Sequence, residues 1–160
     1  MSLKYNGSGN FAVINYDAQG QQIDLLVNTI GKYEGTIPLD FARDFSPAEK
    51  TARLSVESSG EWEIQILPIE DAGLVMVKIP ATIQGVGDDV VWIVGLDPDL
   101  LIIDATKAES NFAVWGWGPG VYDLLVNEIA PYSGTVIIPM NTVVLIIQAT
   151  GPWSIEVTTK

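Results

Sequence analysis

The pentapeptide DLLVN occurs twice in this chain, at 24–28 and again at 123–127. The match extends on both sides, because NFAV occurs at 10–13 and at 111–114 and both copies of DLLVN continue as x-I-x-x-Y-x-G-T. Self-similarity of this kind is typical of a structural unit that is repeated along a chain. The sequence therefore predicts two related units, and any structure assigned to one copy has to suit the other.

A second pair of matching segments follows later in each copy. TARLSVESSGEWEI at 51–64 aligns with TVVLIIQATGPWSI at 142–155, with Thr, Leu, Gly, Trp and Ile in step. Between the matching blocks the first copy carries IPLDFARDFSPAEK where the second has VIIPMN. Loops tolerate insertions of this kind, so we expect the added residues to lie between strands.

Within each copy, β-branched and aromatic residues form short runs separated by Gly, Pro, Asn and Asp, while helix signals are nearly absent. Such runs predict short strands joined by turns. In the second copy we expect strands over 89–95, 100–106, 111–117, 122–129, 133–139, 142–150 and 152–158. Strands at this spacing are typical of a β-sandwich. The predicted fold is all-β, with two related antiparallel β-sandwich units of jelly-roll or immunoglobulin-like type from an internal duplication.

The repeat also predicts the domain boundaries: a first β unit over 1–68, a linker with an extra strand over 69–84, and a second, complete β unit over 85–160. The first NFAV lies close to the start of the chain, so we expect the first unit to be N-terminally truncated and to lack the leading strands that 87–106 supply in the second. An unpaired apolar edge promotes aggregation. We therefore expect the strand at 73–80, or a second chain in a homodimer, to cover the sheet edge of the first unit.

Alternation of side chains assigns the two faces of one strand. In the first copy Leu54 and Val56 alternate with polar residues, which predicts one buried and one solvated face. At the solvated positions the second copy has Val144, Ile146 and Gln148, so this face is apolar there. Burial of two such side chains contributes ~1.5–3 kcal/mol each. We expect the other unit or the linker strand to pack on this face.

Two tryptophans repeat in step with the strands. Trp62 and Trp153 each precede an isoleucine by two residues, Ile64 and Ile155 respectively. Residues two apart on a strand share a face. We expect both tryptophans to be core residues of their units.

Composition excludes several functional classes. The chain has 20 acidic and 8 basic residues, a net charge of −12, which opposes binding to nucleic acid or to anionic membrane surfaces. It has neither cysteine nor histidine, so Ser-His-Asp and Cys-His catalysis, thiolate zinc sites and histidine-ligated metals are excluded. Its apolar runs are shorter than the ~20 residues that a membrane-spanning helix needs. We therefore expect no enzyme activity, no direct membrane insertion and no cofactor apart from calcium, which oxygen ligands can bind.

Paired carboxylates are the only catalytic groups left, and Asp24 with Asp123 is the pair that the repeat offers. Two copies of one structural position face the same way in separate units, and an Asp at a strand entrance commonly stabilises a turn. We interpret both aspartates, and Asn28 and Asn127 at the other end of the pentapeptide, as turn-forming ends of a strand.

Four aspartates flank one predicted strand and are the candidates for a calcium site: Asp88, Asp89, Asp97 and Asp99. Oxygen-rich loops at the rim of a sandwich are common places for calcium. Their spacing does not match an EF-hand, and a solvated acidic rim is the alternative interpretation.

The best candidate for a ligand surface is the Trp-Gly-Trp segment at 115–117. Trp115 and Trp117 share the strand face opposite Phe112. Two indoles on one face could stack on a sugar ring or a proline-rich peptide. We count Tyr122 with them as ligand-binding. An interface with the other unit is the alternative interpretation.

Nearly the whole chain takes part in a family resemblance, which is clearest in GVGDDVVWIVGLDP, SNFAVWGWGPG, DLLVNEIAPYSGTVIIP and LIIQATGPWSIEV. Together these segments resemble an uncharacterised, repeated β-sandwich module of bacterial, notably actinobacterial, proteins. The resemblance implies an accessory region of exported or membrane-associated polypeptides, located outside the cell or in its envelope, with no catalytic residue to assign. Relatives have a G-x-G-D-x-V strand before the first NFAV, which agrees with a truncated first unit.

Three functional hypotheses follow. The first is a non-catalytic extracytoplasmic interaction or spacer module with a protein or glycan partner. The second is a carbohydrate-binding module that uses the face of Trp115 and Trp117. The third is a calcium-supported accessory domain of a secreted enzyme.

Overall fold

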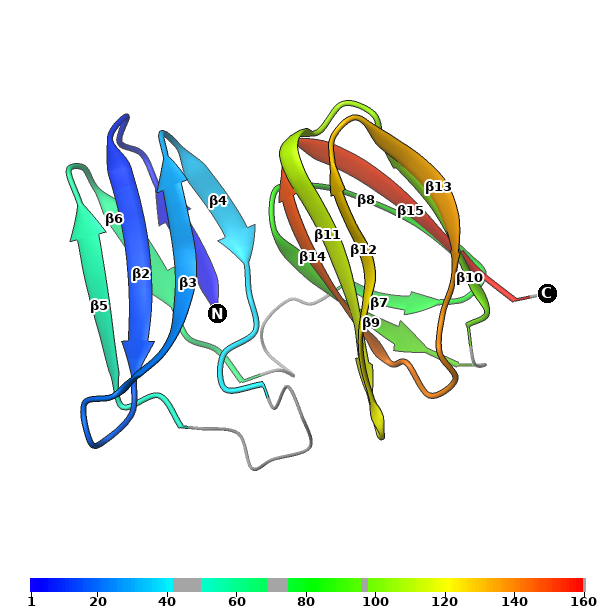
Figure 1. Cartoon of the computed structure of the whole chain (residues 1–160), viewed down its shortest axis with the longest axis horizontal. Coiled ribbons are helices and arrows are strands. Elements are labelled where there is room, and N and C mark those ends of the chain that lie inside the picture. Colours follow the sequence, from blue (N-terminus) through cyan, green and yellow to red (C-terminus); the bar gives the residue numbers. More distant parts are fainter. Residues whose placement is uncertain (42–49, 69–74, 96–97, 160) are drawn as a thin grey trace. The chain divides into compact units, whose positions relative to one another are not determined.

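The computed structural model describes residues 1–41, 50–68, 75–95 and 98–159 (Figure 1). The chain divides into two compact units, Met1–Pro68 and Ile69–Lys160. The described residues form strands and no helix, which confirms the all-β prediction. Consequently, they contain no helix that could span a membrane.

The first unit is a small β-sandwich. Its strands are β1 (Ser2–Tyr5), β2 (Asn10–Tyr16), β3 (Gln22–Ile30), β4 (Tyr33–Thr36), β5 (Arg53–Ser58) and β6 (Trp62–Gln65). They form two three-stranded antiparallel sheets in the orders β4-β1-β6 and β3-β2-β5. The core between the sheets is aromatic at its centre, where the rings of Tyr5 and Phe11 stack with centroids 4.6 Å apart.

The second unit has the same plan with additional strands. Its strands are β7 (Val75–Lys78), β8 (Ala81–Val86), β9 (Asp89–Val94), β10 (Leu100–Ala105), β11 (Glu109–Gly118), β12 (Val121–Ile129), β13 (Tyr132–Ile137), β14 (Val144–Thr150) and β15 (Pro152–Thr158). They form a four-stranded sheet, β13-β10-β15-β8, and a five-stranded sheet, β12-β11-β14-β9-β7. All pairs are antiparallel except β7 with β9.

The two DLLVN segments occupy equivalent places in their units. Strand β2 lies between β3 and β5, just as β11 lies between β12 and β14. Val13 pairs with Val27 in the first unit and Val114 with Val126 in the second, and a β-bulge follows each of these pairs. Asp24 lies at the same point of its strand as Asp123 and its carboxylate accepts the N–H of Leu25 at 2.8 Å.

The leading strands of the second unit, β8 and β9, follow each other in the chain and lie in different sheets. Strand β8 pairs with β15 in one sheet, and β9 pairs with β14 in the other. The first unit has no counterpart of β7, β8 or β9 among the described residues, so β5 and β6 are edge strands there (Figure 1).

Of the two predicted covers for the edge of the first unit, a second chain stays a prediction, and the strand at 73–80 was wrong. Its described part, β7, pairs in parallel with β9 and extends the five-stranded sheet of the second unit. Strand β8 begins within the expected linker as well and pairs with β15. The reason is that β7 and β8 complete the sheets of the unit that follows them, with Ile79 and Ile83 buried in its core.

The core prediction for the two tryptophans was correct for one of them. Trp153 is buried at 3% exposure, whereas Trp62 is 49% exposed. The backbone positions are equivalent, since both tryptophans lie at the start of the last strand of their units. They differ because β15 has strands on both sides, with Gly85 of β8 opposite Trp153, whereas among the described residues β6 has a neighbour on one side alone, where Tyr5 of β1 pairs with Trp62.

Candidate functional site

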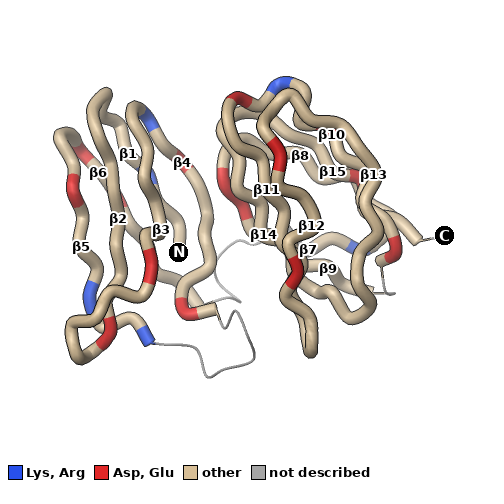
Figure 2. Tube along the Cα trace, viewed as in Figure 1, with Lys and Arg blue, Asp and Glu red and all other residues tan. Residues whose placement is uncertain are grey.

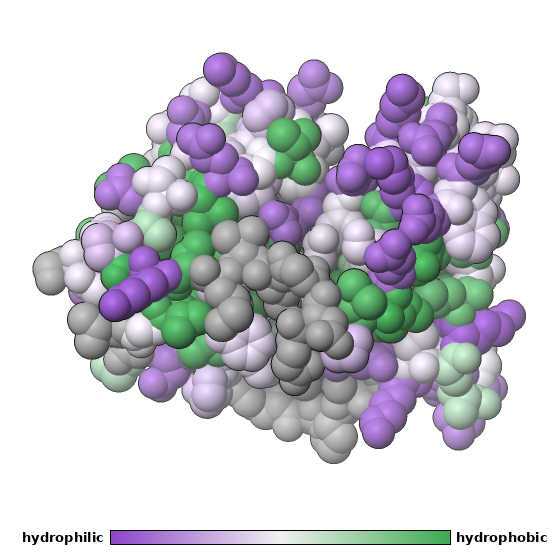
Figure 3. All heavy atoms as spheres, turned by 180° about the vertical axis from the view of Figure 1, so that it is seen from behind, coloured by the Kyte–Doolittle hydropathy of each residue, from purple (hydrophilic) through white to green (hydrophobic). Residues whose placement is uncertain are grey.

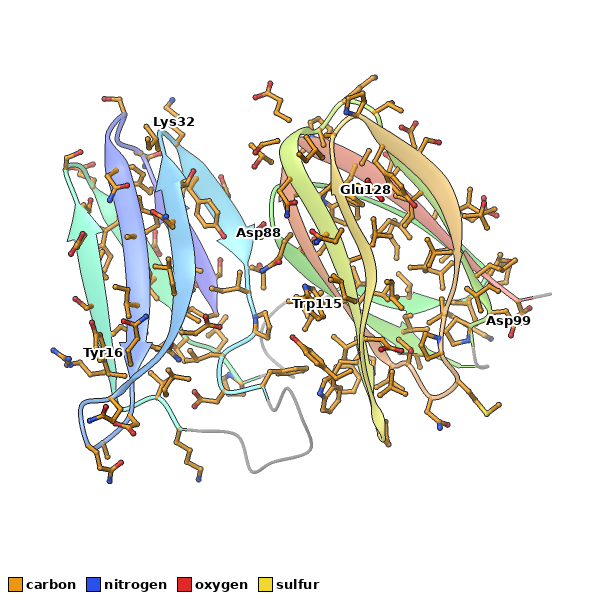
Figure 4. All side chains as sticks on the ribbon, viewed as in Figure 1. Tyr16, Lys32, Asp88, Asp99, Trp115 and Glu128 are labelled. Carbon is orange, nitrogen blue, oxygen red and sulfur yellow. The ribbon has the colours of Figure 1, made fainter. Side chains whose placement is uncertain are left out.

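The outer face of the five-stranded sheet carries most of the aromatic side chains of the second unit. Phe112 and Val114 of β11 lie in the core, so the alternating residues Trp115 and Trp117 project to the other side of the sheet. Figure 4 shows Trp115 pointing away from the four-stranded sheet. The side chains predicted to be ligand-binding therefore lie outside the sandwich.

Strand pairing arranges this surface in two neighbouring rows. One row crosses four strands as Trp92, Val144, Trp117 and Tyr122, and the other crosses them as Val90, Ile146, Trp115 and Leu124. We call these eight residues the aromatic face. Val90, Val144 and Ile146 are buried, while the three tryptophans and Tyr122 are partly exposed and Leu124 is exposed. The partly exposed aromatic rings therefore lie beside three buried aliphatic side chains.

Glycines on the inner side of β11 allow the tryptophans to take this position. A Cβ atom added to Gly118 would lie 1.8 Å from the backbone oxygen of Asn141, so only glycine fits where β11 passes the loop before β14. The alternation Trp-Gly-Trp-Gly therefore places both large side chains outward and leaves the crowded inner side without side chains.

Two of the aromatic rings stack on each other. The ring centroids of Trp115 and Tyr122 are 5.0 Å apart and their planes differ by 13°. Tyr122 is opposite Trp117 in the register and diagonal to Trp115, a spacing over which aromatic side chains reach each other. One face of each ring is consequently covered by the other, which leaves less flat ring surface for a sugar than two separate indoles would offer.

The first unit has a polar surface at the equivalent positions. Ile14 and Tyr16 stand where the second unit has Trp115 and Trp117, and they pair with Ser55 and Arg53 of β5. The Arg53 guanidinium carbon lies 4.1 Å from the centroid of the Tyr16 ring, a cation–π contact. The aromatic face is therefore a property of the second unit, as the alternation of β5 and β14 predicted.

The aromatic face contains no charged residue, although the chain is acidic. Figure 2 shows Asp and Glu distributed over the strands and turns of both units, with Lys and Arg much fewer. The described residues form one ion pair between side chains, Lys4 with Glu34 at 3.4 Å, in the first unit. The side chains of the aromatic face are therefore apolar or aromatic, with the Tyr122 hydroxyl as their one polar group.

Each described aspartate of the calcium candidates has a structural contact. The carboxylate of Asp88 accepts the N–H of Ala149 at 2.9 Å, and that of Asp89 accepts the N–H of Val90 at 2.8 Å. Burial raises the pKa of Asp89 above its usual value. Asp99 contributes backbone bonds, donating its N–H to the Thr158 oxygen at 3.0 Å.

The structure does not bring these aspartates together. Asp88 and Asp89 lie at the start of β9 and Asp99 beyond its end, so the strand separates them by ~17 Å, and Figure 4 shows Asp88 and Asp99 far apart. Asp97 lies outside the described residues. In the described part of the chain, no three acidic side chains are close enough to share a metal ion.

Sequence reasoning found Trp115, Trp117 and Tyr122 but missed Trp92 and Leu124, which complete the rows. Trp92 could have been found, since it alternates with the buried Val91 and Ile93 in DVVWIV. No protein-family model matches the chain, and no curated protein shows significant sequence similarity to it. Its function is therefore inferred from the geometry of the site.

Proposed function

We propose that the chain is a non-catalytic interaction module and that the aromatic face of its second unit binds a partner protein. The observation that carries this proposal is the pair of apolar rows across four strands, at positions where the first unit has Arg53 and Ser55. Leu124 is exposed and the four rings are partly exposed, and accessible apolar surface of this kind can mark an interaction site. The absence of histidine and cysteine from the sequence supports a non-catalytic role. The resemblance to exported bacterial modules favours an extracytoplasmic setting.

A protein is favoured over a glycan as the partner. Glycan recognition combines ring stacking with polar side chains that bind hydroxyl groups. The two rows of the aromatic face contain a single hydroxyl group, that of Tyr122, and no side-chain carboxylate, amide or basic group. The stacked pair of Trp115 and Tyr122 also covers one face of each ring. Carbohydrate binding by Trp115 and Trp117 is the second candidate, favoured by the exposure of both indoles on one strand.

The test compares two double variants at equivalent positions. In Trp115→Ala/Trp117→Ala the aromatic face loses two rings, and in Ile14→Ala/Tyr16→Ala the first unit loses its counterparts. A hot-spot tryptophan contributes about 2 kcal/mol or more, which is roughly thirtyfold in affinity. We expect proteins cross-linked to the wild-type chain on intact bacterial cells to be lost with the tryptophan variant and retained with the control.

Glycan arrays probed with the same three proteins distinguish the second candidate. A glycan signal that only the tryptophan variant loses would favour carbohydrate binding. If both variants capture the same proteins as the wild type, or if the tryptophan variant unfolds cooperatively at much lower temperature, the two indoles have a packing role and the proposal is wrong.

A further inference from the structure

The turn between β1 and β2 contains the one asparagine of the chain that is followed by glycine, in the pair Asn6-Gly7. This turn joins the two sheets of the first unit, since β1 and β2 lie in different sheets (Figure 1). Asn6 is exposed, and Figure 3 shows mainly hydrophilic side chains at the end of the unit where Figure 1 draws the turn. Water therefore reaches the Asn6 side chain.

An Asn-Gly pair is reactive, because the main-chain nitrogen of the glycine can attack the side-chain carbonyl carbon of the asparagine. The attack closes a five-membered ring, and such an intramolecular reaction is strongly favoured over attack by a separate molecule. Glycine helps because it has no side chain and its backbone reaches conformations that other residues avoid. The other asparagines of the chain are followed by Phe, Tyr, Thr or Glu, which are larger.

The structure leaves both reacting groups available. The hydrogen bonds of the described residues include none to the Asn6 side chain and none from the Gly7 N–H. Asn15 is the contrast, because it is buried and its amide donates to Thr51 and accepts from Asp24. An amide held by two hydrogen bonds is fixed away from the next main-chain nitrogen, whereas the amide of Asn6 is free to turn towards it.

The packing of the core requires the glycine of this pair. A Cβ atom at Gly7 would lie 2.1 Å from the hydroxyl oxygen of Tyr5, whose side chain is 1% exposed and stacks on Phe11. A Cβ atom at Gly60 would in turn lie 2.8 Å from the Gly7 Cα atom. The residue that makes Asn6 reactive is therefore also the residue that lets the turn pass over the Tyr5 ring.

We propose that Asn6 is a site of spontaneous deamidation, which gives the first unit one more negative charge. The Gly7 nitrogen bonds to the Asn6 Cγ atom, and its proton passes to the side-chain nitrogen, which leaves as ammonia. Water then opens the resulting succinimide at either carbonyl group and leaves aspartate or isoaspartate at position 6. The reaction needs water alone, and the site does not depend on the aromatic face.

Isoaspartate at position 6 alters the contact between the turn and β6. In isoaspartate the main chain runs through the Cβ atom, so the backbone becomes longer by one methylene group. The Asn6 N–H donates to the Glu61 oxygen at 3.0 Å, next to the pair of Tyr5 with Trp62. The longer backbone shifts Gly7 past Gly60 and breaks this hydrogen bond. Since one hydrogen bond corresponds to about fivefold in local opening, amides of β1 and β6 should exchange roughly fivefold faster.

The test ages the intact chain for about two weeks at about 37 °C and pH 8 and then measures peptide masses. We expect the peptide that contains Asn6 to gain about 1 Da, as NH2 is replaced by OH, and to become a substrate of protein isoaspartyl methyltransferase. The rate should rise with pH, up to roughly tenfold per pH unit, because the attacking nitrogen reacts after losing its proton. Asn28 and Asn127 are exposed internal references and should keep their amides.

Asn6→Gln is the matched control. It keeps an exposed amide at position 6, but attack by the next nitrogen would have to close a six-membered ring, which forms far more slowly. The Asn6 side chain makes no hydrogen bond to the described residues, so the variant should fold as the wild type does. We expect no mass gain at position 6 in the variant, and unchanged exchange in β1 and β6 after the same ageing.

Three results would contradict the proposal. One is an unchanged mass in the folded chain while the same chain in urea is deamidated, which would mean that the turn holds the two groups apart. Another is an equal mass gain at Asn28 or Asn127, which would indicate hydrolysis of exposed amides without help from glycine. Deamidation at position 6 without faster exchange in β1 and β6 would disprove the effect on the sheets.

Discussion

Replacing Trp153 by Ala should destabilise the second unit much more than the same replacement of Trp62 destabilises the first. The two residues occupy equivalent strand positions, and they differ in what lies beside them. Trp153 packs against Gly85 and its indole N–H donates to Gly87. Trp62 lies on an edge strand, with half of its surface open to solvent.

The difference in exposure sets the magnitude. The exposed fractions are 3% for Trp153 and 49% for Trp62. A tryptophan side chain buries up to ~250 Å², so this difference corresponds to ~115 Å², or ~3 kcal/mol at ~25 cal/mol per Å². The hydrogen bond of the Trp153 indole contributes about 1 kcal/mol more. We therefore expect the free energies of unfolding lost by the two variants to differ by ~3–4 kcal/mol.

The opening free energy of each unit can be measured in the intact chain by native-state hydrogen exchange. Amides of β2 report on the first unit and amides of β11 on the second, since both strands are central in their sheets. Trp153→Phe is a matched control, because it keeps an aromatic ring and removes the N–H donor. Equal losses for Trp153→Ala and Trp62→Ala, within ~1 kcal/mol, would refute the argument that strand β8 and the turn after it create the burial of Trp153.

Two further predictions concern single polar side chains. Asn15 is buried, its Nδ2 donates to the Thr51 Oγ1 at 2.8 Å and its Oδ1 accepts the N–H of Asp24 at 2.8 Å. Asn15→Ala should therefore lower the free energy of unfolding of the first unit by ~1–3 kcal/mol and reduce its urea midpoint. An unchanged midpoint would contradict this prediction. Burial raises the pKa of Asp89 above the usual 3.8, so the second unit loses stability as the pH rises through the folded-state pKa of this carboxyl. Thermal unfolding should accordingly show a higher melting temperature for Asp89→Asn than for the wild type at pH 7, and a smaller difference at pH 3. A larger difference at pH 3 would mean that folding lowers the pKa of Asp89.

The two units share one plan and differ in two features. The aromatic face belongs to the second unit, and the exposed edge strands β5 and β6 belong to the first. The second unit has tryptophans where the first has Ile14 and Tyr16, and it has strands β8 and β9, for which the described residues of the first unit show no counterpart.

Local sequence patterns determined the strands and the two-unit plan. Runs of β-branched residues between turns predicted strands of the second unit to within a few residues, and the alternation in β14 predicted its apolar outer face. These features depend on neighbouring residues in one strand, so a single sequence contains them. The positions of Trp115 and Trp117 followed from the same alternation.

Only the tertiary structure decided which strands pair and which side chains become buried. The apolar strand at 73–80 suits either unit in composition, and its described part joins the second because β9 provides an edge and Ile79 enters that core. Trp62 and Trp153 match in sequence, yet one is exposed and the other is buried, because the burial of Trp153 depends on strand β8, which is remote from it in the chain. Strand pairing and burial are relations between distant segments, so the pattern within one segment does not determine them.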